Sequence, residues 1–215
     1  MQPTQNYKQT LDDLATLYTN YYHTHRASTN PFKLEEAIAT NPDFQYGPDK
    51  IIIRENLAEH VGSLPIVASF LHPYIEHKVD LGKALQMLAI HDIAETTLGD
   101  ENIFSKSQAK EDQEFEETMR LLHPSQHEIF KEFEAMETNE SKFAKSIDKL
   151  TPDLIDYLCQ PEVILIRFSL QMHTTPDKIL ELVRSFKTKY MLWDGFLKVF
   201  HETMLSEFEK NLAKF

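Results

Sequence analysis

The stretch LAIHDIAETTLGD, residues 88–100, places His91 and Asp92 directly after an apolar run. On a helix, Glu95 lies four residues after His91 and three after Asp92, so the three side chains share one surface. The preceding residues, ALQMLAI, are apolar enough to be buried. A buried carboxylate is costly unless it is paired or bound to a metal. The stretch therefore predicts a polar site inside an otherwise apolar helical layer.

Bulk composition narrows the class of protein. The 215 residues include only 5 glycines, and long runs at helical spacing indicate a single all-α domain over residues 1–215. A net charge of −12 argues against binding to nucleic acid or to an anionic membrane surface. The single Cys159 cannot form an internal disulfide, and no signal peptide or membrane-length apolar run is present, so we expect a cytoplasmic protein.

Apolar periodicity and capping residues predict the helices. Asn56 and Glu59 resemble a capping box that starts one of them, and Pro65 should kink that helix or end its regular hydrogen bonding. Thr151 and Pro152 are typical of an N-cap and first helical residue, so one helix should end there and another begin. The segment 161–172 is a buried helix or, as the alternative, a strand. The expected helices are 7–26, 33–39, one from about 56, 81–97, 105–122, one from 124, 139–150, one from 152, 177–190 and 193–213.

Two further polar residues lie beside apolar helix faces. His60 is at the edge of the stripe formed by Leu57, Val61 and Leu64, and Asp148 lies beside a face that includes Ile147. A lone histidine in such a place is more often a core residue than a metal ligand. Two histidines together with the acids Asp92 and Glu95 on successive helices make a ligand role more plausible, but spacing alone leaves both interpretations open.

The order His60, His91-Asp92, Asp148 resembles the H…HD…D pattern of the HD-domain metal-dependent phosphohydrolases. The flanking stretches ENLAEH, HDIAETTLGD, DKL and KEDQEFEETMRLL are similar to those of the bacterial deoxynucleoside 5′-monophosphatases and their eukaryotic relatives. The resemblance covers about residues 44–160. It implies an all-α HD-domain helical bundle, with an extra N-terminal helix and a C-terminal helical extension over about 161–215.

This resemblance implies that His60, His91, Asp92 and Asp148 hold one divalent metal ion. Imidazole and carboxylate ligands suit Mn, Co, Fe, Zn or Ni, without choosing among them. Glu95 and Asp100 match positions that family members use in catalysis. Glu95 would orient or deprotonate the attacking water, and Asp100 would protonate the leaving oxygen or hold the hydrogen-bond network. The alternatives are a solvated helix residue for Glu95 and a turn residue or cap for Asp100.

The substrate-binding residues are expected in the loop before His60. Arg54 would meet the phosphate, because a guanidinium binds phosphate with two hydrogen bonds. The relatives carry an Arg-Trp pair about fifteen residues before the first histidine, where this chain has Gln45 and Tyr46. Tyr46 would offer an aromatic face to a base or sugar. Weaker phosphate candidates are Lys106, Lys110 and Lys149, and His23, His25 and Arg26 have the pattern of a solvated helix end.

The predicted function is metal-dependent hydrolysis of a nucleoside 5′-monophosphate or a similar small phosphoester, a 5′-nucleotidase-like phosphomonoesterase. The alternatives are hydrolysis of a nucleoside triphosphate or an alarmone, and a regulatory module that keeps the metal without turnover. A GYP motif is missing beside the HD pair, which argues against a cyclic-dinucleotide phosphodiesterase. The aromatic C-terminal helices predict a homodimer interface.

Overall fold

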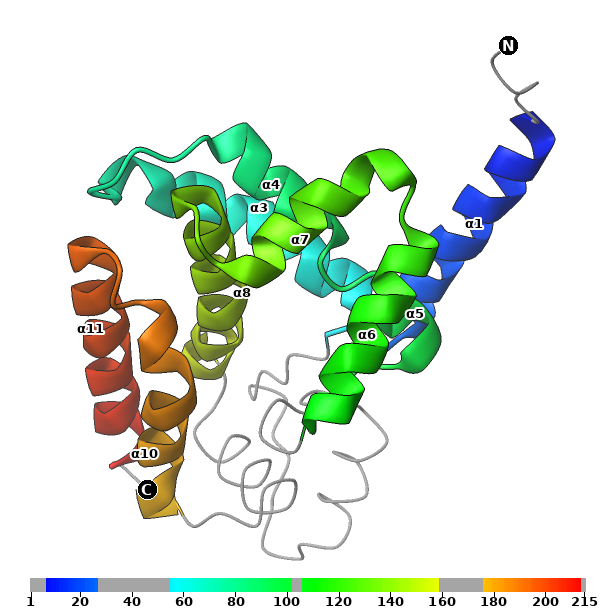
Figure 1. Cartoon of the computed structure of the whole chain (residues 1–215). Coiled ribbons are helices and arrows are strands. Elements are labelled where there is room, and N and C mark those ends of the chain that lie inside the picture. The colour runs from blue at the N-terminus through cyan, green and yellow to red at the C-terminus, as the bar shows by residue number, and fades with distance from the viewer. Residues whose placement is uncertain (1–6, 27–54, 102–105, 159–175, 214–215) are drawn as a thin grey trace, which may run out of the picture.

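The computed structural model describes residues 7–26, 55–101, 106–158 and 176–213, and its regular elements there are all helical (Figure 1). This confirms the all-α prediction. Outside the helices, one isolated antiparallel bridge joins His25 to Asn56. The elements are α1 (Tyr7–His23), α3 (Leu57–Leu71), η1 (His72–Tyr74), α4 (Leu81–Ile90), α5 (Glu95–Leu98), α6 (Gln108–Leu121), η2 (Pro124–Gln126), α7 (His127–Ala135), α8 (Asn139–Leu158), α10 (Pro176–Lys187), η3 (Thr188–Tyr190) and α11 (Gly195–Leu212).

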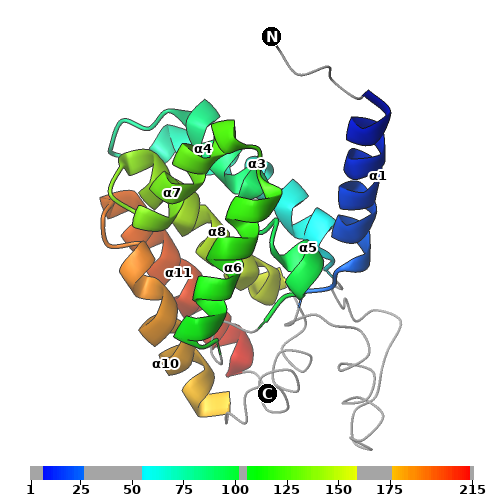
Figure 2. The ribbon, with the colours of Figure 1, turned by 45° about the vertical axis from the view of Figure 1, so that its right-hand side comes forward.

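Helix α8 is the central element, with α3, α4, α7 and α11 packed around it (Figures 1 and 2). Its apolar side is completely buried against these neighbours through Phe143 and Ile147, and Leu64 of α3 and Met87 of α4 pack into the same core. Each such side chain stabilises the fold by about 1.5–3 kcal/mol. Because Asp148 follows Ile147 directly, the packing of α8 also fixes the position of that carboxylate.

The start of α3 is defined by local hydrogen bonds and by the end of α1. The predicted capping box is present, since the Asn56 side chain accepts from the Glu59 amide at 2.9 Å and the Glu59 carboxylate accepts from the Asn56 amide at 2.9 Å. In addition, the Leu57 amide donates to the Thr24 carbonyl at 2.8 Å, and the Arg26 amide donates to the Glu55 carbonyl at 3.1 Å. These bonds bring the residues after α1 beside the first turn of α3.

The helix predicted over 81–97 is interrupted at the HD pair. Helix α4 ends at Ile90, and α5 begins only at Glu95. Between them the backbone bonds join residues three apart, with the Glu95 amide donating to the Asp92 carbonyl at 3.1 Å. This tighter winding has about three residues per turn, so Asp92 and Glu95 lie one above the other. Gly99, with φ of 75°, ends α5 as the sequence predicts.

The prediction that one helix ends at Thr151 and another starts at Pro152 was wrong. Helix α8 continues through Pro152 to Leu158. Proline lacks the amide that would bond the carbonyl of Asp148, and this cost is of order 3 kcal/mol. The buried side chains on both sides of the proline, Leu150 and Asp153 among them, hold the helix together. Helix α3 likewise continues past Pro65 to Leu71.

The remaining predicted helices lie close to the observed ones. The predicted helix from 124 is a 3-10 turn, η2, followed by α7, and the predicted helix over 177–190 is α10 followed by η3. The segments 33–39 and 161–172 are outside the described residues. Among the helices of the described ranges, none combines the length and the apolar character needed to cross a membrane.

Asp194 connects the last helix to the α3–α4 connection. Its carboxylate caps α11 by accepting from the Leu197 amide at 3.1 Å. It also accepts from the Glu76 amide at 2.9 Å and lies 3.0 Å from His77 Nδ1. Burial opposes ionisation, but the His77 side chain and the two amides outweigh it and lower the pKa of Asp194.

We expect Asp194→Ala to lower the free energy of unfolding in urea by about 2–3 kcal/mol at pH 7, because a helix cap and a buried charged acceptor are lost together. A carboxyl with a lowered folded pKa contributes fully above its unfolded pKa of about 3.9 and loses that contribution as the pH falls through the folded value. The difference between wild type and variant should therefore shrink only below about pH 4. Glu207→Ala, which breaks the exposed pair with Lys210, is the control and should cost no more than about 0.5 kcal/mol.

Candidate metal centre

The four predicted metal ligands meet at one point. His60 comes from α3, His91 and Asp92 from the turn after α4, and Asp148 from α8, and one potential ligand atom from each lies within 4.8 Å of the others. His91 Nε2 is 3.0 Å from Asp92 Oδ1 and 3.3 Å from Asp148 Oδ1. His60 Nε2 is 3.6 Å from Asp92 Oδ2 and 3.5 Å from Asp148 Oδ1. Residues 88 positions apart in the chain thus converge on a common position.

The histidines are oriented as metal ligands would be. His91 Nδ1 lies 2.9 Å from the Leu88 carbonyl, which can only accept, so Nδ1 carries a proton and Nε2 is the nitrogen left for the ligand position. His60 Nδ1 is 3.6 Å from a Glu55 carboxylate oxygen, an arrangement that leaves its Nε2 for the ligand position. Within the described part of the chain, both buried Nε2 atoms have no hydrogen-bond partner. Two such nitrogens and two carboxylates fit a divalent cation.

The charges at the centre keep both aspartates ionised. For Asp148, burial is opposed by Lys149, whose Nζ lies 2.8 Å from Oδ2, and by the two histidines, and the net effect lowers its pKa. The pKa of Asp92 is also lowered, because His91 and Arg26 outweigh burial. Burial disfavours protonation of His91, yet Asp92 and Asp148 raise its pKa to about 10. The same carboxylates that attract a proton here would attract a metal cation.

Arg26 is part of this centre, and its interpretation as a solvated helix end was wrong. Its NH1 lies 2.8 Å from Glu95 Oε2, 3.1 Å from Asp92 Oδ2 and 3.4 Å from Asp100 Oδ1. Only 15% of its side chain is exposed. Sequence reasoning missed it because it lies 66 residues before Asp92. The available signal was indirect: several buried carboxylates require a cation from somewhere.

Glu95 and Asp100, the predicted catalytic residues, both contact Arg26, which also contacts the predicted ligand Asp92. Glu95 is buried, with 8% of its side chain exposed, and is therefore not a solvated helix residue. Burial and the negative charge of Asp92 raise its pKa well above the usual value, although Arg26 opposes them. A carboxyl group of raised pKa beside a metal site is suited to accept and donate protons near neutral pH.

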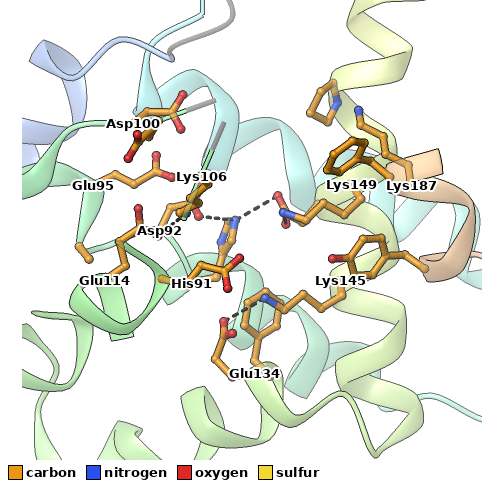
Figure 3. A pocket seen from close by; sticks show the side chains of 18 of the residues that line it. His91, Asp92, Glu95, Asp100, Lys106, Glu114, Glu134, Lys145, Lys149 and Lys187 are labelled. Atoms are coloured by element: carbon orange, nitrogen blue, oxygen red, sulfur yellow. Dashed lines mark hydrogen bonds and ion pairs between the residues drawn. The ribbon is translucent and has the colours of Figure 1, made fainter. Parts of the chain in front are cut away.

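A cavity of about 590 Å³ opens on the centre and has two unlike walls (Figure 3). In Figure 3, Glu95, Asp100 and Glu114 reach in from the side of α5 and α6. Lysine side chains, Lys145, Lys149 and Lys187, reach in from the opposite side, formed by α8 and α10. Of the predicted lysine candidates, Lys106 and Lys149 line the cavity and Lys110 is not among its described lining residues. Gln45, Tyr46 and Arg54 lie outside the described residues, so their roles stay predictions.

The lysine wall depends on the C-terminal helices. Lys187, at the end of α10, pairs with Asp153 Oδ1 of α8. His201 of α11 lies beside the other oxygen of that carboxylate, with Nε2 3.2 Å from Oδ2. All three side chains are buried. The network therefore ties α10 and α11 to the helix that carries the metal ligand Asp148, and completes one wall of the cavity.

His91→Ala and Asp148→Ala should each lower the metal content of the purified protein far below that of wild type, because each removes a ligand atom that the others cannot replace. Elemental analysis after dialysis measures the effect, and thermal unfolding checks that the variants fold. His23→Ala, an exposed histidine at the end of α1, is the control and should keep its metal. Wild-type metal content in both ligand variants would contradict the assignment.

Arg26→Met should destabilise the protein without removing a metal ligand. The substitution keeps an apolar stem but leaves Asp92, Glu95 and Asp100 without their shared cation, which costs about 3–5 kcal/mol for a buried pair. Urea unfolding of the metal-free protein measures the loss. Lys8→Met breaks an exposed pair with Asp12 on α1 and should change stability by no more than about 0.5 kcal/mol. Equal effects of the two substitutions would show that Arg26 has no special role.

Comparison with known proteins gives one family and a set of similar folds. Residues 47–188 match the family described as HD domain. This region extends past residue 160 and includes α10. A search of curated proteins finds no significant match.

Three solved structures illustrate the similarity in fold. A protein from Magnetospirillum magnetotacticum MS-1, described as a predicted metal-dependent phosphohydrolase, has a TM-score of 0.60 at 22% identity, over 95% of each chain. The PH0347 protein from Pyrococcus horikoshii OT3 has a TM-score of 0.57 at 16% identity, over 92% of this chain and 99% of its own. A conserved hypothetical protein from Pyrococcus furiosus has a TM-score of 0.57 at 19% identity, over 90% of this chain and 98% of its own. At these identities the similarity concerns the fold.

Proposed function

The chain belongs to the HD-domain family, and on this premise we propose that it is a divalent-metal-dependent phosphohydrolase acting on a small phosphomonoester, with nucleoside 5′-monophosphates as the substrate class. The observation that carries the proposal is the convergence of His60, His91, Asp92 and Asp148 at the end of a cavity. The description of the Magnetospirillum protein as a predicted metal-dependent phosphohydrolase agrees with it.

The metal centre supports hydrolysis by a bound water. A divalent cation held by these four residues would polarise a phosphoryl oxygen and lower the pKa of a water molecule bound to it. The chain itself holds the ligands in the required form, since Leu88 fixes the tautomer of His91 and Lys149 keeps Asp148 ionised. Mn, Co, Fe, Zn and Ni all suit this mixture of nitrogen and oxygen ligands.

Proton transfer is assigned to the carboxyl groups around Arg26. Glu95 lies three residues from Asp92, and its raised pKa lets it take a proton from water and release it again. Asp100, which contacts the same nitrogen of Arg26 as Glu95, is the donor to the leaving oxygen. Arg26 binds both carboxylates through one nitrogen, so it positions them on the same side of the metal ligands.

The charge distribution of the cavity favours a single phosphate. Among the described lining residues, acidic side chains outnumber basic ones two to one. The lysines gather on the α8 and α10 wall, where Lys149 Nζ is 2.8 Å from a metal ligand and can also attract a phosphate oxygen. A triphosphate or an alarmone would extend further negative charge along the acidic wall, which is unfavourable. Arg54 and Tyr46 remain the predicted contacts to phosphate and base.

A screen of phosphorylated compounds with each of the five metals tests the proposal. Nucleoside monophosphates should release one orthophosphate per molecule in a metal-dependent manner. Release of tripolyphosphate from a nucleoside triphosphate, or of pyrophosphate from an alarmone, would assign the site to those substrates. A protein that binds metal but hydrolyses none of the compounds would instead be a regulatory module.

Glu95→Gln should separate proton transfer from metal binding. The amide keeps the size of the side chain and can still accept from Arg26, but it cannot take a proton from water. Turnover of the best substrate should fall by about two to four orders of magnitude, with metal content unchanged. Glu59→Gln, in the capping box of α3, is a matched control on an exposed carboxylate. A wild-type rate for Glu95→Gln would remove Glu95 from the mechanism.

A further inference from the structure

Glu114 of α6 has one carboxylate oxygen without a hydrogen-bond partner among the described residues. Its Oε2 pairs with Lys106 Nζ, which holds the side chain in place. Its Oε1 is buried from solvent and meets no hydrogen-bond donor within the described ranges of the chain. A buried acceptor without a donor costs about 1–3 kcal/mol, and more when the acceptor is charged. A buried acceptor of this kind is suited to accept a hydrogen bond from a bound ligand.

The position of Glu114 brings this acceptor close to the proposed reaction. It lines the cavity on the same side as Asp92 and Glu95, opposite Lys145 and Lys149 (Figure 3). Burial and the charge of Asp92 both act to raise the pKa of Glu114, and Lys106 acts against them. The carboxylate therefore lies within the electrostatic reach of the metal ligands without contacting them.

The residues around Glu114 indicate which kind of substrate group would bind beside it. Helix α6 turns Gln108, Glu111, Phe115 and Thr118 toward the cavity, a spacing that corresponds to one helix face. Phe115 is 39% exposed and lies 5.5 Å, ring centre to ring centre, from Phe130. The face thus combines hydrogen-bond acceptors with an aromatic ring, and the nearby cation Lys106 is already paired with Glu114. It suits an uncharged group that carries hydrogen-bond donors.

We propose that Glu114 is a specificity-determining residue whose free Oε1 accepts a hydrogen bond from a hydroxyl or amino group on the leaving group of the substrate. This inference rests on the proposed function, because it assumes that the phosphate lies at the metal centre and toward the lysine wall. The leaving group then points to α6. Phosphoesters with donor groups on the alcohol part are preferred over those without them, and a second phosphate in that position is rejected by the acidic face.

Glu114→Gln gives a sharp test because Lys106 decides how the amide is oriented. The ammonium group requires an acceptor, so the amide oxygen will face Lys106 and the NH₂ group will take the place of Oε1. A hydrogen-bond donor of the protein then occupies the position where the substrate requires an acceptor. The measured quantity is the ratio of kcat/KM for adenosine 5′-monophosphate, which has hydroxyl and amino donors, to kcat/KM for phenyl phosphate, which has neither.

We expect Glu114→Gln to lower this ratio by about ten- to a hundredfold, the value of one charge-assisted hydrogen bond, with metal content unchanged. The paired substitution Lys106→Met with Glu114→Leu removes both ends of the ion pair and should lower the ratio in the same way. Glu116→Gln, on an exposed position of the same helix that does not line the cavity, is the control and should leave the ratio at its wild-type value.

The outcomes separate this inference from the proposed function. If neither phosphoester is hydrolysed by the metal-loaded wild type or by the control, the proposed function fails. If both are hydrolysed but Glu114→Gln and the paired substitution leave the ratio unchanged, or lower both kcat/KM values equally, the role of Glu114 is overturned and the proposed function stands.

Discussion

The compensation of buried carboxylates is the constraint on which the rest of this structure depends. Glu95 and Asp148 are buried and the Asp92 side chain is only 14% exposed, so an uncompensated negative charge on them would cost several kcal/mol. Arg26 faces the first two, and Lys149 faces the third at 2.8 Å. The pairs of Arg26 link the residues after α1 to α5 and the turn before it, whereas Lys149 and Asp148 are neighbours on α8. The helices can bury their polar residues only in an arrangement that keeps every pair together.

The backbone around His91 and Asp92 places their side chains where metal ligands are expected. A continuous α-helix would turn Asp92 and Glu95 by about 300° over three residues, whereas the three-residue winding aligns them on one side. His91 is fixed separately, by the bond to the Leu88 carbonyl and by the edge of the Phe133 ring at 5.5 Å between ring centres. The break between α4 and α5 therefore positions the predicted ligands His91 and Asp92 together with the proposed proton carrier Glu95.

The sequence was sufficient for the fold class, for most helices and for the clustering of the four predicted ligands, because each of these depends on local patterns or on an ordered motif. It was insufficient where distant residues decide the outcome. Arg26 lies in the mostly polar stretch HTHRAST, residues 23–29, and nothing local indicates that it reaches Asp92. Pro152 has the usual signs of a helix start, but the buried residues around it outweigh the missing hydrogen bond. The spacing of 81–97 could not distinguish α-helix from the tighter turn, since apolar periodicity is similar in both.

The two walls of the cavity explain how a chain with a net charge of −12 could attract an anion. The lysines Lys145, Lys149 and Lys187 are on α8 and α10, next to the site where a divalent cation would add two further charges. Glu95 and Glu114 lie across the cavity on α5 and α6. A molecule with a phosphate at one end and neutral hydrogen-bond donors at the other is oriented by this field before it makes close contacts. Because Lys187 of α10 belongs to the positive wall and is held there by Asp153, the helices beyond residue 160 take part in that orientation. The proposal of a phosphomonoester substrate therefore depends more on the positions of the lysines than on the metal ligands. Any HD-domain phosphohydrolase would need those ligands.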